Sequence, residues 1–522
     1  MTHTRYPFSL SRNAATLPPK PEPTTTTSKS DVDSVDPLTA FLFCCIISTM
    51  MTHRDALVSK VLPAIDRADV EFNRLDRPDS PLRPIPPGRD YFAPRWKRSR
   101  EFLFGPWIDI EEEAAPSEFT RWRDDYFWQA DEHIIPVVDM FERLGHGDAR
   151  AIFEQALTNG IDTVDSPPPE LVRFFDRIDT FPDWLDLAAA QRGRTLVSSA
   201  TMLSVMAILG WAVFETTMTG DISAATGAAG RFQHQGLRRQ VETVRMFGLM
   251  SHPSVFERHS EAFHTITRVR LMHGLVSRGL KRKWGPEIYL KYGEPIAASS
   301  LLGFGNGPLL LRLADHQLGR RLSRGQLDDI AMYAAYTSWL LGAPDNLRTR
   351  DGIELVKSLN YVFARGGDPS AWRAELLDSF AGMIRESTDI RLRKASPAAR
   401  ERSVHVAKVG MACSSFVPLA MIFGPDQVDA MVEGTEFEKL GIDYTLAGRW
   451  FERAARIYAR TAALRERAPG VTLLRNQVHG RIVPQAVLRI VNESERLLLA
   501  GQGAGSTYTH HDKSTGGAGL TG

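Results

Sequence analysis

Phe263–His273 reads FHTITRVRLMH and has the apolar periodicity of a buried helix, with a histidine at its end. Helical steps of three, four and seven from His273 reach an apolar face with two polar neighbours: Ile266, Val269, Val276 and Leu280, with Arg270 and Ser277. A neutral imidazole on such a face must either find a hydrogen bond or hold a metal. A core histidine satisfied by a hydrogen bond is the commoner case, and the residues alone leave both possibilities open.

A second helical segment precedes this one. Arg239 and Thr243 lie four residues apart, a spacing that puts both on one helix face. On the residues alone, a solvated surface position is the commoner case for Arg239, and a site is the alternative. The Thr243 hydroxyl can equally bond back to a carbonyl of its own helix.

Together the two segments resemble the haem oxygenase family of the latex-clearing proteins, or rubber oxygenases. That family has an Arg-x-x-x-Thr helix and then an Arg-x-Arg-Leu-x-His helix, matched here by Arg239, Thr243, Arg268, Arg270, Leu271 and His273. The interval of 34 residues from Arg239 to His273 also fits. Weaker similarities lie at Pro182–Trp184 with Arg192-Gly193, and at Trp339–Pro344. The resemblance covers roughly residues 130–350.

The resemblance implies an all-α protein with a globin-like helical core and additional flanking helices. It implies one b-type haem with His273 as the proximal iron ligand. Arg239 would lie near the haem, where it donates to oxygen or holds a propionate, and Thr243 would be a smaller polar group beside it. Arg270 would bind a haem propionate or a buried carboxylate. The implied activity is O2-dependent attack on a carbon–carbon double bond of an apolar, isoprenoid-like substrate.

Two departures from the family pattern cast doubt on rubber as the substrate. Prototype rubber oxygenases carry a buried glutamate before the arginine helix, but residues 222–236 here contain no acid, and Glu215 and Asp221 do not match by spacing. Glu242 stands where prototypes may present a lysine, and a carboxylate cannot donate a hydrogen bond as an ammonium does.

Other functions stay open. A haem-binding or haem-sensing protein without turnover is compatible with the missing acid. A helical membrane-associated scaffold would rest on the apolar runs 38–52 and 197–218. A non-haem metal site at Asp131–His133 and Asp328-Asp329 lacks the Glu-x-x-His pairs that a carboxylate-bridged site needs. Among the further histidines His133, His252, His259 and His264, the last lies on the face of its helix opposite to His273.

Bulk properties exclude several classes. The chain has 522 residues, with 63 Lys and Arg against 62 Asp and Glu, so it lacks the basic excess that nucleic-acid binding requires. Three cysteines cannot build a disulfide framework or a Cys-rich zinc site. Cys44 and Cys45 are adjacent, and Cys413 is expected to be a small buried apolar residue. Neither the oligomeric state nor the cleavage position follows from the sequence.

We expect five regions. They are a disordered leader with a short apolar segment (1–52), a Pro-rich wrapping loop (53–115), a haem-binding core (116–365), a C-terminal helical region packed on the core (366–500) and a disordered tail (501–522). The uncharged run within the leader would make the protein secreted or membrane-associated if it is a targeting segment, and cytoplasmic otherwise. It also lies just before Met50 and Met51, either of which could be a translation start.

Within the helical regions, the apolar run 197–218 is expected to form one central helix that is buried on all sides. Gly227, Gly230 and Gly236 are expected to mark a loop, and the Gly-rich segment 303–308 is expected to break a helix pair. Residues 447–467 form an amphipathic helix with repeated arginines, typical of a solvated surface and sometimes of a membrane surface.

Overall fold

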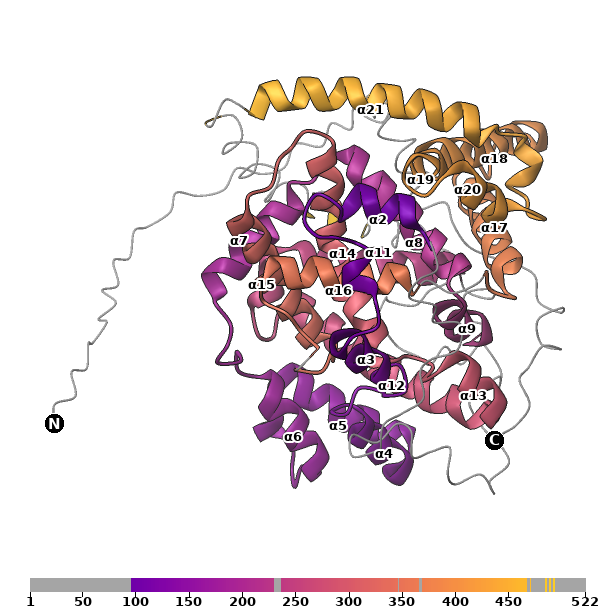
Figure 1. Cartoon of the computed structure of the whole chain (residues 1–522). Helices are drawn as coiled ribbons and strands as arrows, with labels where there is room; N and C mark the ends of the chain where they lie inside the picture. The colour runs from indigo at the N-terminus through magenta and orange to yellow at the C-terminus, as the bar shows by residue number, and fades with distance from the viewer. Residues whose placement is uncertain are drawn as a thin grey trace, which may run out of the picture. The chain divides into compact units, whose positions relative to one another are not determined.

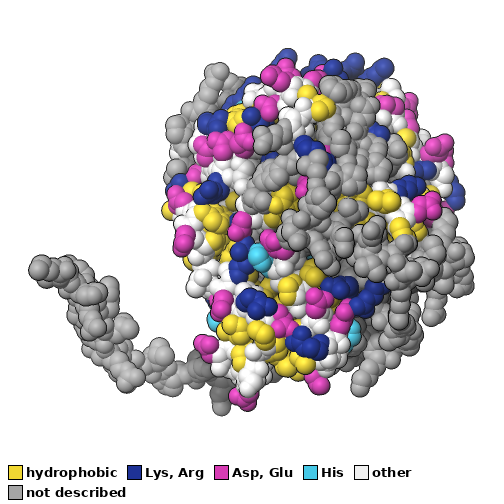
Figure 2. All heavy atoms as spheres, turned by 60° about the horizontal axis from the view of Figure 1, so that its bottom comes forward, with side chains coloured by type: hydrophobic (Ala, Val, Ile, Leu, Met, Phe, Trp, Pro, Cys, Tyr) yellow, Lys and Arg dark blue, Asp and Glu magenta, His cyan; other side chains and the backbone are white. Residues whose placement is uncertain are grey.

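The computed structural model describes residues 95–229, 236–345, 347–365 and 369–466, with a few isolated positions beyond. The leader 1–52, most of the wrapping segment and the tail therefore lie outside the described residues. Within them the chain is all-α, 75% helical and without strands, which confirms the expected fold class (Figure 1). On the face in Figure 2, basic and acidic side chains are interspersed with apolar ones.

The helices that build and surround the core come first. They are α2 (Lys97–Leu103), α3 (Glu118–Asp125), α4 (Ile135–Leu144), α5 (His146–Asn159), α6 (Pro169–Ile178), α7 (Leu187–Ser198), α8 (Met202–Met218), α9 (Gly220–Ala229), α11 (Gly236–Ser251), α12 (Glu261–Lys283), α13 (Pro286–Tyr292), α14 (Ala298–Gln317), α15 (Arg324–Leu340) and α16 (Gly352–Ala364). The C-terminal set follows: α17 (Arg373–Arg391), α18 (Pro397–Met411), a π-helical turn (Ala412–Phe416), α19 (Val417–Ile422), α20 (Pro425–Val432) and α21 (Tyr444–Glu466).

The core is one large apolar cluster to which nearly all of these helices contribute. Side chains such as Phe104, Phe141 and Leu313 are completely or almost completely buried in it. α7 and α15 pack closely along their lengths, helped by Gly193, where an added Cβ would come within 2.0 Å of the Asp329 carbonyl oxygen. Close backbone approach of this kind requires glycine.

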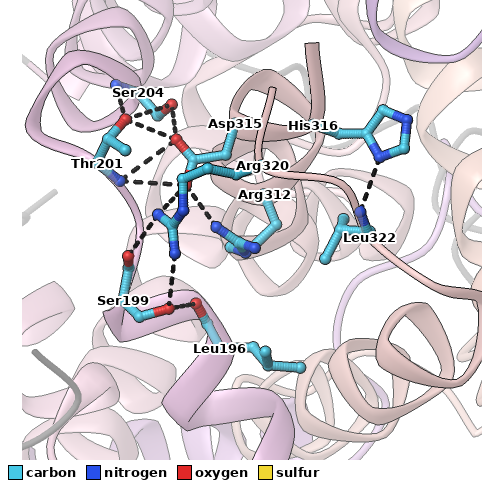
Figure 3. A network of polar contacts seen from close by, with 9 residues as sticks. All are labelled: Leu196, Ser199, Thr201, Ser204, Arg312, Asp315, His316, Arg320 and Leu322. Atoms are coloured by element: carbon cyan, nitrogen blue, oxygen red, sulfur yellow. Dashed lines mark hydrogen bonds and ion pairs between the residues drawn. The ribbon is translucent and has the colours of Figure 1, made fainter. Parts of the chain in front are cut away.

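The apolar run 197–218 does not form the single helix that the sequence predicts. It is divided into α7 and α8, which meet at 92°. The break lies at Ser199–Thr201, where the Arg320 guanidinium donates to the Ser199 carbonyl oxygen (2.7 Å) and the Thr201 backbone N–H and hydroxyl donate to the Asp315 carboxylate (Figure 3). Polar partners from the end of α14 and the residues after it therefore stabilise a bend inside an apolar run.

The Asp315 carboxylate is fully buried and holds several partners at once. It accepts from Ser204 of α8 and from the guanidinium groups of Arg312 and Arg320. These bonds compensate the cost of burying the charge. Thr201 also caps α8 by accepting from the Ser204 backbone N–H.

The Gly-rich segment 303–308 does not break a helix either, because α14 continues through it. α14 packs against α15, α8 and α7, and tertiary packing of this kind outweighs the low helix propensity of its glycines and proline. Gly227 likewise lies inside α9, with its Cα facing the Trp372 ring. Gly230 lies outside the described residues.

Two smaller expectations are corrected. α2 is a regular helix within the segment that was expected to be a loop. Cys413 is exposed, because it lies in the π-helical turn, where one extra residue per turn changes which side chains face the core.

Among the described residues, one helix, Pro397–Ile422, is long and apolar enough to cross a membrane, and 67% of its most apolar part is buried inside the protein. The α7–α8 pair passes the same test only if the bend is ignored. A buried core helix satisfies such a test as readily as a membrane span.

Candidate functional site

α12 carries the predicted ligand His273. The helix begins at Ser260, whose hydroxyl accepts from the Phe263 backbone N–H at 3.1 Å. Ile266 and Val269 on the predicted apolar face are fully or almost fully buried, as the periodicity predicts. His273 is half-buried as a residue, and its Nδ1 atom is fully buried.

The surroundings of His273 keep its ring neutral. Burial and, to a smaller extent, the positive charge of Arg239 together lower the pKa of the imidazole to about 4, while Asp131 opposes them. At neutral pH a ring nitrogen therefore keeps the lone pair that a metal ligand needs. The influence of Arg239 also means that α11 and α12, which pack on one another, bring the two predicted motifs together.

Arg239 and Thr243 occupy one face of α11, as predicted. The Arg239 guanidinium is 26% exposed, and its Nη1 lies 3.7 Å from Glu242 Oε2. The Thr243 hydroxyl donates to the Arg239 carbonyl oxygen at 2.9 Å, which is the local bond considered as its alternative. The oxygen of such a hydroxyl can still accept a hydrogen bond.

Arg270 takes the second of its two expected partners, a buried carboxylate. Its Nε lies 2.5 Å from Asp131 Oδ2 and its Nη2 lies 2.9 Å from Asp131 Oδ1, while Nη1 donates to the Trp339 carbonyl oxygen at 3.4 Å. Arg270 is 1% exposed and Asp131 is 6% exposed. Because this guanidinium is engaged on each side, Arg270 fixes α12 in place and is not assigned to the cofactor below.

The segment Trp339–Pro344 closes over this ion pair. Gly342 adopts a φ of +96°, and an added Cβ would lie 2.0 Å from Asp131 Oδ2 and 2.8 Å from Arg270 Nε. Both the left-handed backbone and the absence of a side chain are therefore required at this position. The segment Trp339–Pro344 therefore lies next to the part of α12 that carries Arg270. The spacing of the two segments in the sequence does not reveal this proximity.

The remaining motif residues are structural. Arg268 binds Glu154 of α5, with Nη2 to Oε2 at 2.6 Å. Arg192 forms a two-point ion pair with Asp329 of α15. Asp329 and Asp131, both named for a non-haem metal site, are thus each paired with an arginine. In the described part of the chain no group of three His, Cys, Asp or Glu side chains is arranged to hold a metal ion.

A small cavity of about 220 Å³ lies beside His273. Its wall is largely apolar, with Ile135, Ile296, Leu301 and Leu341, and Asp131 also borders it. Arg239 and Thr243 do not line it. The donor set, a neutral imidazole with a guanidinium from the adjacent helix, fits a haem. The 220 Å³ includes space open to solvent, and the enclosed part is far too small for a haem, so haem binding requires the surrounding helices to separate.

A second cavity, of about 450 Å³ including its opening to solvent, lies among α8, α9, α14 and α16. Glu215 borders it, and burial raises the pKa of that carboxyl to about 8, helped by the negative charge of Asp221. The buried hydroxyls of Thr219 and Ser299 also border it and have no hydrogen-bond partner among the described residues. In the sequence, Glu215 does not match the spacing of the family pattern and was therefore not predicted as a site residue. The only signal for it was its position as an acid within an otherwise apolar helix.

No family model matches this chain, and no curated protein does. Among solved structures, a latex clearing protein in the closed state matches with 14% identity and a TM-score of 0.39, covering 65% of this chain and 91% of that chain. A likeness at this level does not establish a common fold.

Proposed function

We propose that this protein is a haem-b-dependent oxygenase that attacks a carbon–carbon double bond in an apolar, isoprenoid-like substrate, with His273 as the iron ligand. One observation carries the proposal. Two short motifs that are 34 residues apart in the sequence lie on α11 and α12, which pack against each other.

The chain's own residues have separate roles in this proposal. Bound haem would supply the one-electron chemistry with O2 that amino-acid side chains lack. His273 would hold the iron, and the Arg270–Asp131 pair would hold the α12 backbone that carries it. Arg239 does not line the space beside His273, so it would reach the haem only once the helices have separated; there it would donate N–H groups to developing negative charge, which a low dielectric strengthens. Thr243 would accept a hydrogen bond next to it.

The substrate class is inferred from the wall of the cavity beside His273. Ile135, Ile296 and Leu301 present hydrocarbon surface, which excludes water and favours an apolar chain over a charged one. This wall favours apolar molecules in general and does not distinguish one from another. Polyisoprene and smaller terpenoids therefore both belong to the proposed class of substrates.

The test begins with the purified full chain titrated with haem b. We expect a Soret band that saturates at one haem per chain, confirmed by pyridine haemochrome analysis. The loaded protein should then consume O2 when squalene is added and yield carbonyl products. Absence of saturable haem binding contradicts the whole proposal, including its cofactor.

A haem-binding protein without turnover is the second candidate, and one observation favours it. Glu242 lies between two arginines, with its carboxylate 3.4 Å from Arg238 and 3.7 Å from Arg239. This carboxylate neutralises part of the charge that catalysis would use. Stoichiometric haem without O2 uptake on any isoprenoid would favour this function over the oxygenase.

A further inference from the structure

Among the described residues, the long C-terminal helix α21 is attached to the rest of the protein along one face only. It packs on α19 and α20, where Tyr444 and Ala455 are almost fully buried. At Gly448 an added Cβ would lie 3.2 Å from the Ala420 Cβ, so the helix backbone runs close to α19. Figure 1 shows α21 as one uninterrupted helix along the upper edge of the view. This packed face fixes which side chains point away.

Three large apolar side chains point away from the protein. Leu446, Trp450 and Ile457 are 54%, 61% and 63% exposed. At about 100° per residue their directions fall within roughly 40° of one another, so they form one strip. The other large exposed apolar side chains of the described residues are scattered over separate elements: Leu144, Phe181, Phe247, Leu290 and Val406. Single exposed apolar residues need no explanation, whereas a contiguous strip does.

A row of positive charge borders this strip along one side. It consists of four exposed arginines, Arg449, Arg453, Arg456 and Arg460. Arg453 lies over the Trp450 ring at 5.1 Å, and Arg456 pairs with Glu452 at 2.6 Å. Long arginine side chains can extend their charged ends away from an apolar surface that their stems cover. α21 therefore presents an apolar strip and a cationic strip side by side, both facing away from the core.

We propose that α21 lies in the interface of an anionic lipid bilayer, with Leu446, Trp450 and Ile457 inserted at the level of the headgroups and the arginine row against lipid phosphates. Apolar insertion and attraction to anionic lipids are the two contributions that bind amphipathic helices to membranes. A stable protein interface takes roughly 20–30 residues on each side, far more than this strip provides. The inference is independent of the haem.

The experiment measures vesicle binding by the purified full chain. Vesicles of phosphatidylcholine alone are compared with vesicles in which a quarter of the lipid is phosphatidylglycerol, at low and high salt. We expect binding to the anionic vesicles that weakens as salt rises. The double change Trp450→Ser and Ile457→Ser should weaken it at least about tenfold, and Arg453→Gln about fivefold.

The matched control is Val406→Ser. Val406 is 59% exposed on α18, outside the strip, so binding should not change. The altered side chains are exposed, and unchanged circular dichroism and melting confirm folding of each variant. Hydrogen exchange on anionic vesicles should slow over residues 446–460.

Three outcomes overturn the inference. If α21 inserts, the double variant must bind more weakly than the unchanged chain, so equal binding places the membrane contact elsewhere, for instance in residues 38–52. Equal binding to neutral and anionic vesicles removes the role of the arginine row. A change of oligomeric state in the double variant, with vesicle binding intact, makes the strip a contact between two copies of the chain.

Discussion

Arg270 and Arg239 flank the same histidine but are held in opposite ways. Arg270 is 1% exposed and is fixed by two short bonds to Asp131 and a third to a backbone carbonyl. Arg239 keeps 26% of its side chain exposed and has a single long ion pair of 3.7 Å to Glu242. Arg270 therefore holds the fold in place, while Arg239 retains N–H donors for another group.

This contrast separates two roles that the sequence motif presents alike. A buried charge pair with saturated hydrogen bonds holds elements in one arrangement, and its rupture leaves an uncompensated charge. A partly solvated guanidinium can redirect its N–H groups toward a ligand at little cost. The four predictions that follow test the contrast at the histidine, at each arginine and at a buried carboxyl.

The largest effect is expected at the histidine that both arginines flank. His273→Ala should abolish stoichiometric haem binding, because it removes the proposed iron ligand. His264→Ala is the control, since that residue is half-buried on the opposite face of the same helix. The Soret absorbance of equally loaded proteins measures the difference. Equal haem content in unchanged protein and His273→Ala would refute the ligand assignment.

Removing the ion-pair partner of the buried Arg270 should destabilise the protein. Asp131→Ala leaves the Arg270 charge buried, and we expect a loss of about 3–5 kcal/mol in the free energy of unfolding. Asp139→Ala is the matched control. It removes the partner of Arg278, a second Asp–Arg pair with the same sequence separation, but Asp139 is 51% exposed, and a loss of less than about 1 kcal/mol is expected.

Denaturant titration measures both variants. Gly342→Ala gives an independent check on the same region, because its Cβ would meet the ion pair, whereas Gly325→Ala enters open space in α15. If Asp131→Ala and Asp139→Ala destabilise the protein equally, the distinction between a fixed and an adjustable arginine fails.

Replacing the partly exposed Arg239 should lower the rate of turnover and leave the fold intact. Arg239→Gln should retain haem and lose roughly a hundredfold to a thousandfold in oxygenase rate, as expected for one preorganised donor. Arg238→Gln is closely matched, because Arg238 is 27% exposed and also faces Glu242, yet it is not among the groups acting on the His273 pKa. O2 uptake per haem compares them. Loss of haem in Arg239→Gln would make this residue a structural anchor like Arg270.

The smallest effect concerns the carboxyl of Glu215, which borders the second cavity. Burial raises the pKa of Glu215 to about 8, so the folded protein holds a proton there that the unfolded chain releases from about pH 4.5 upward. Stability should therefore fall as pH rises from about 4.5 to 8. Glu215→Gln removes this dependence and should stabilise the protein by about 1–3 kcal/mol at pH 8, with little effect at pH 4.5.

Melting temperatures of the two proteins across this range test the prediction. Glu101→Gln, at a side chain that is 57% exposed, serves as the control and should follow the unchanged protein at each pH. A parallel pH dependence in Glu215→Gln and unchanged protein would mean that Glu215 is already ionised in the folded state.

Helical periodicity in the sequence predicted the features that depend on residues close together in the chain. The apolar face of α12, the pairing of Arg239 and Thr243 on one face of α11 and the all-α class follow from helical periodicity, and the structure confirms them. A buried carboxylate was one of two expected partners for Arg270, but its identity was hidden, because Asp131 lies 139 residues away in the sequence.

The predictions that were wrong, or that the sequence did not allow, concern features decided by residues far apart in the chain. The run 197–218 has no internal signal for a bend, because the groups that stabilise it, Asp315 and Arg320, come more than a hundred residues later. The glycines of 303–308 predict a break only if the surrounding helices are ignored. The cavity that contains Glu215 brings together four helices, so no spacing rule applied to one segment could locate it.

The Asp315 cluster also imposes an order on biosynthesis. Thr201 leaves the ribosome 114 residues before the carboxylate that holds it. At about 5–20 residues per second the apolar segments of α7 and α8 therefore wait roughly 6–23 s for the partner that sets their bend. During this interval the nascent chain presents its longest uncharged stretch with nothing to distinguish it from a membrane insert. The bend between α7 and α8 therefore acquires its polar partners only after the end of α14 has been synthesised.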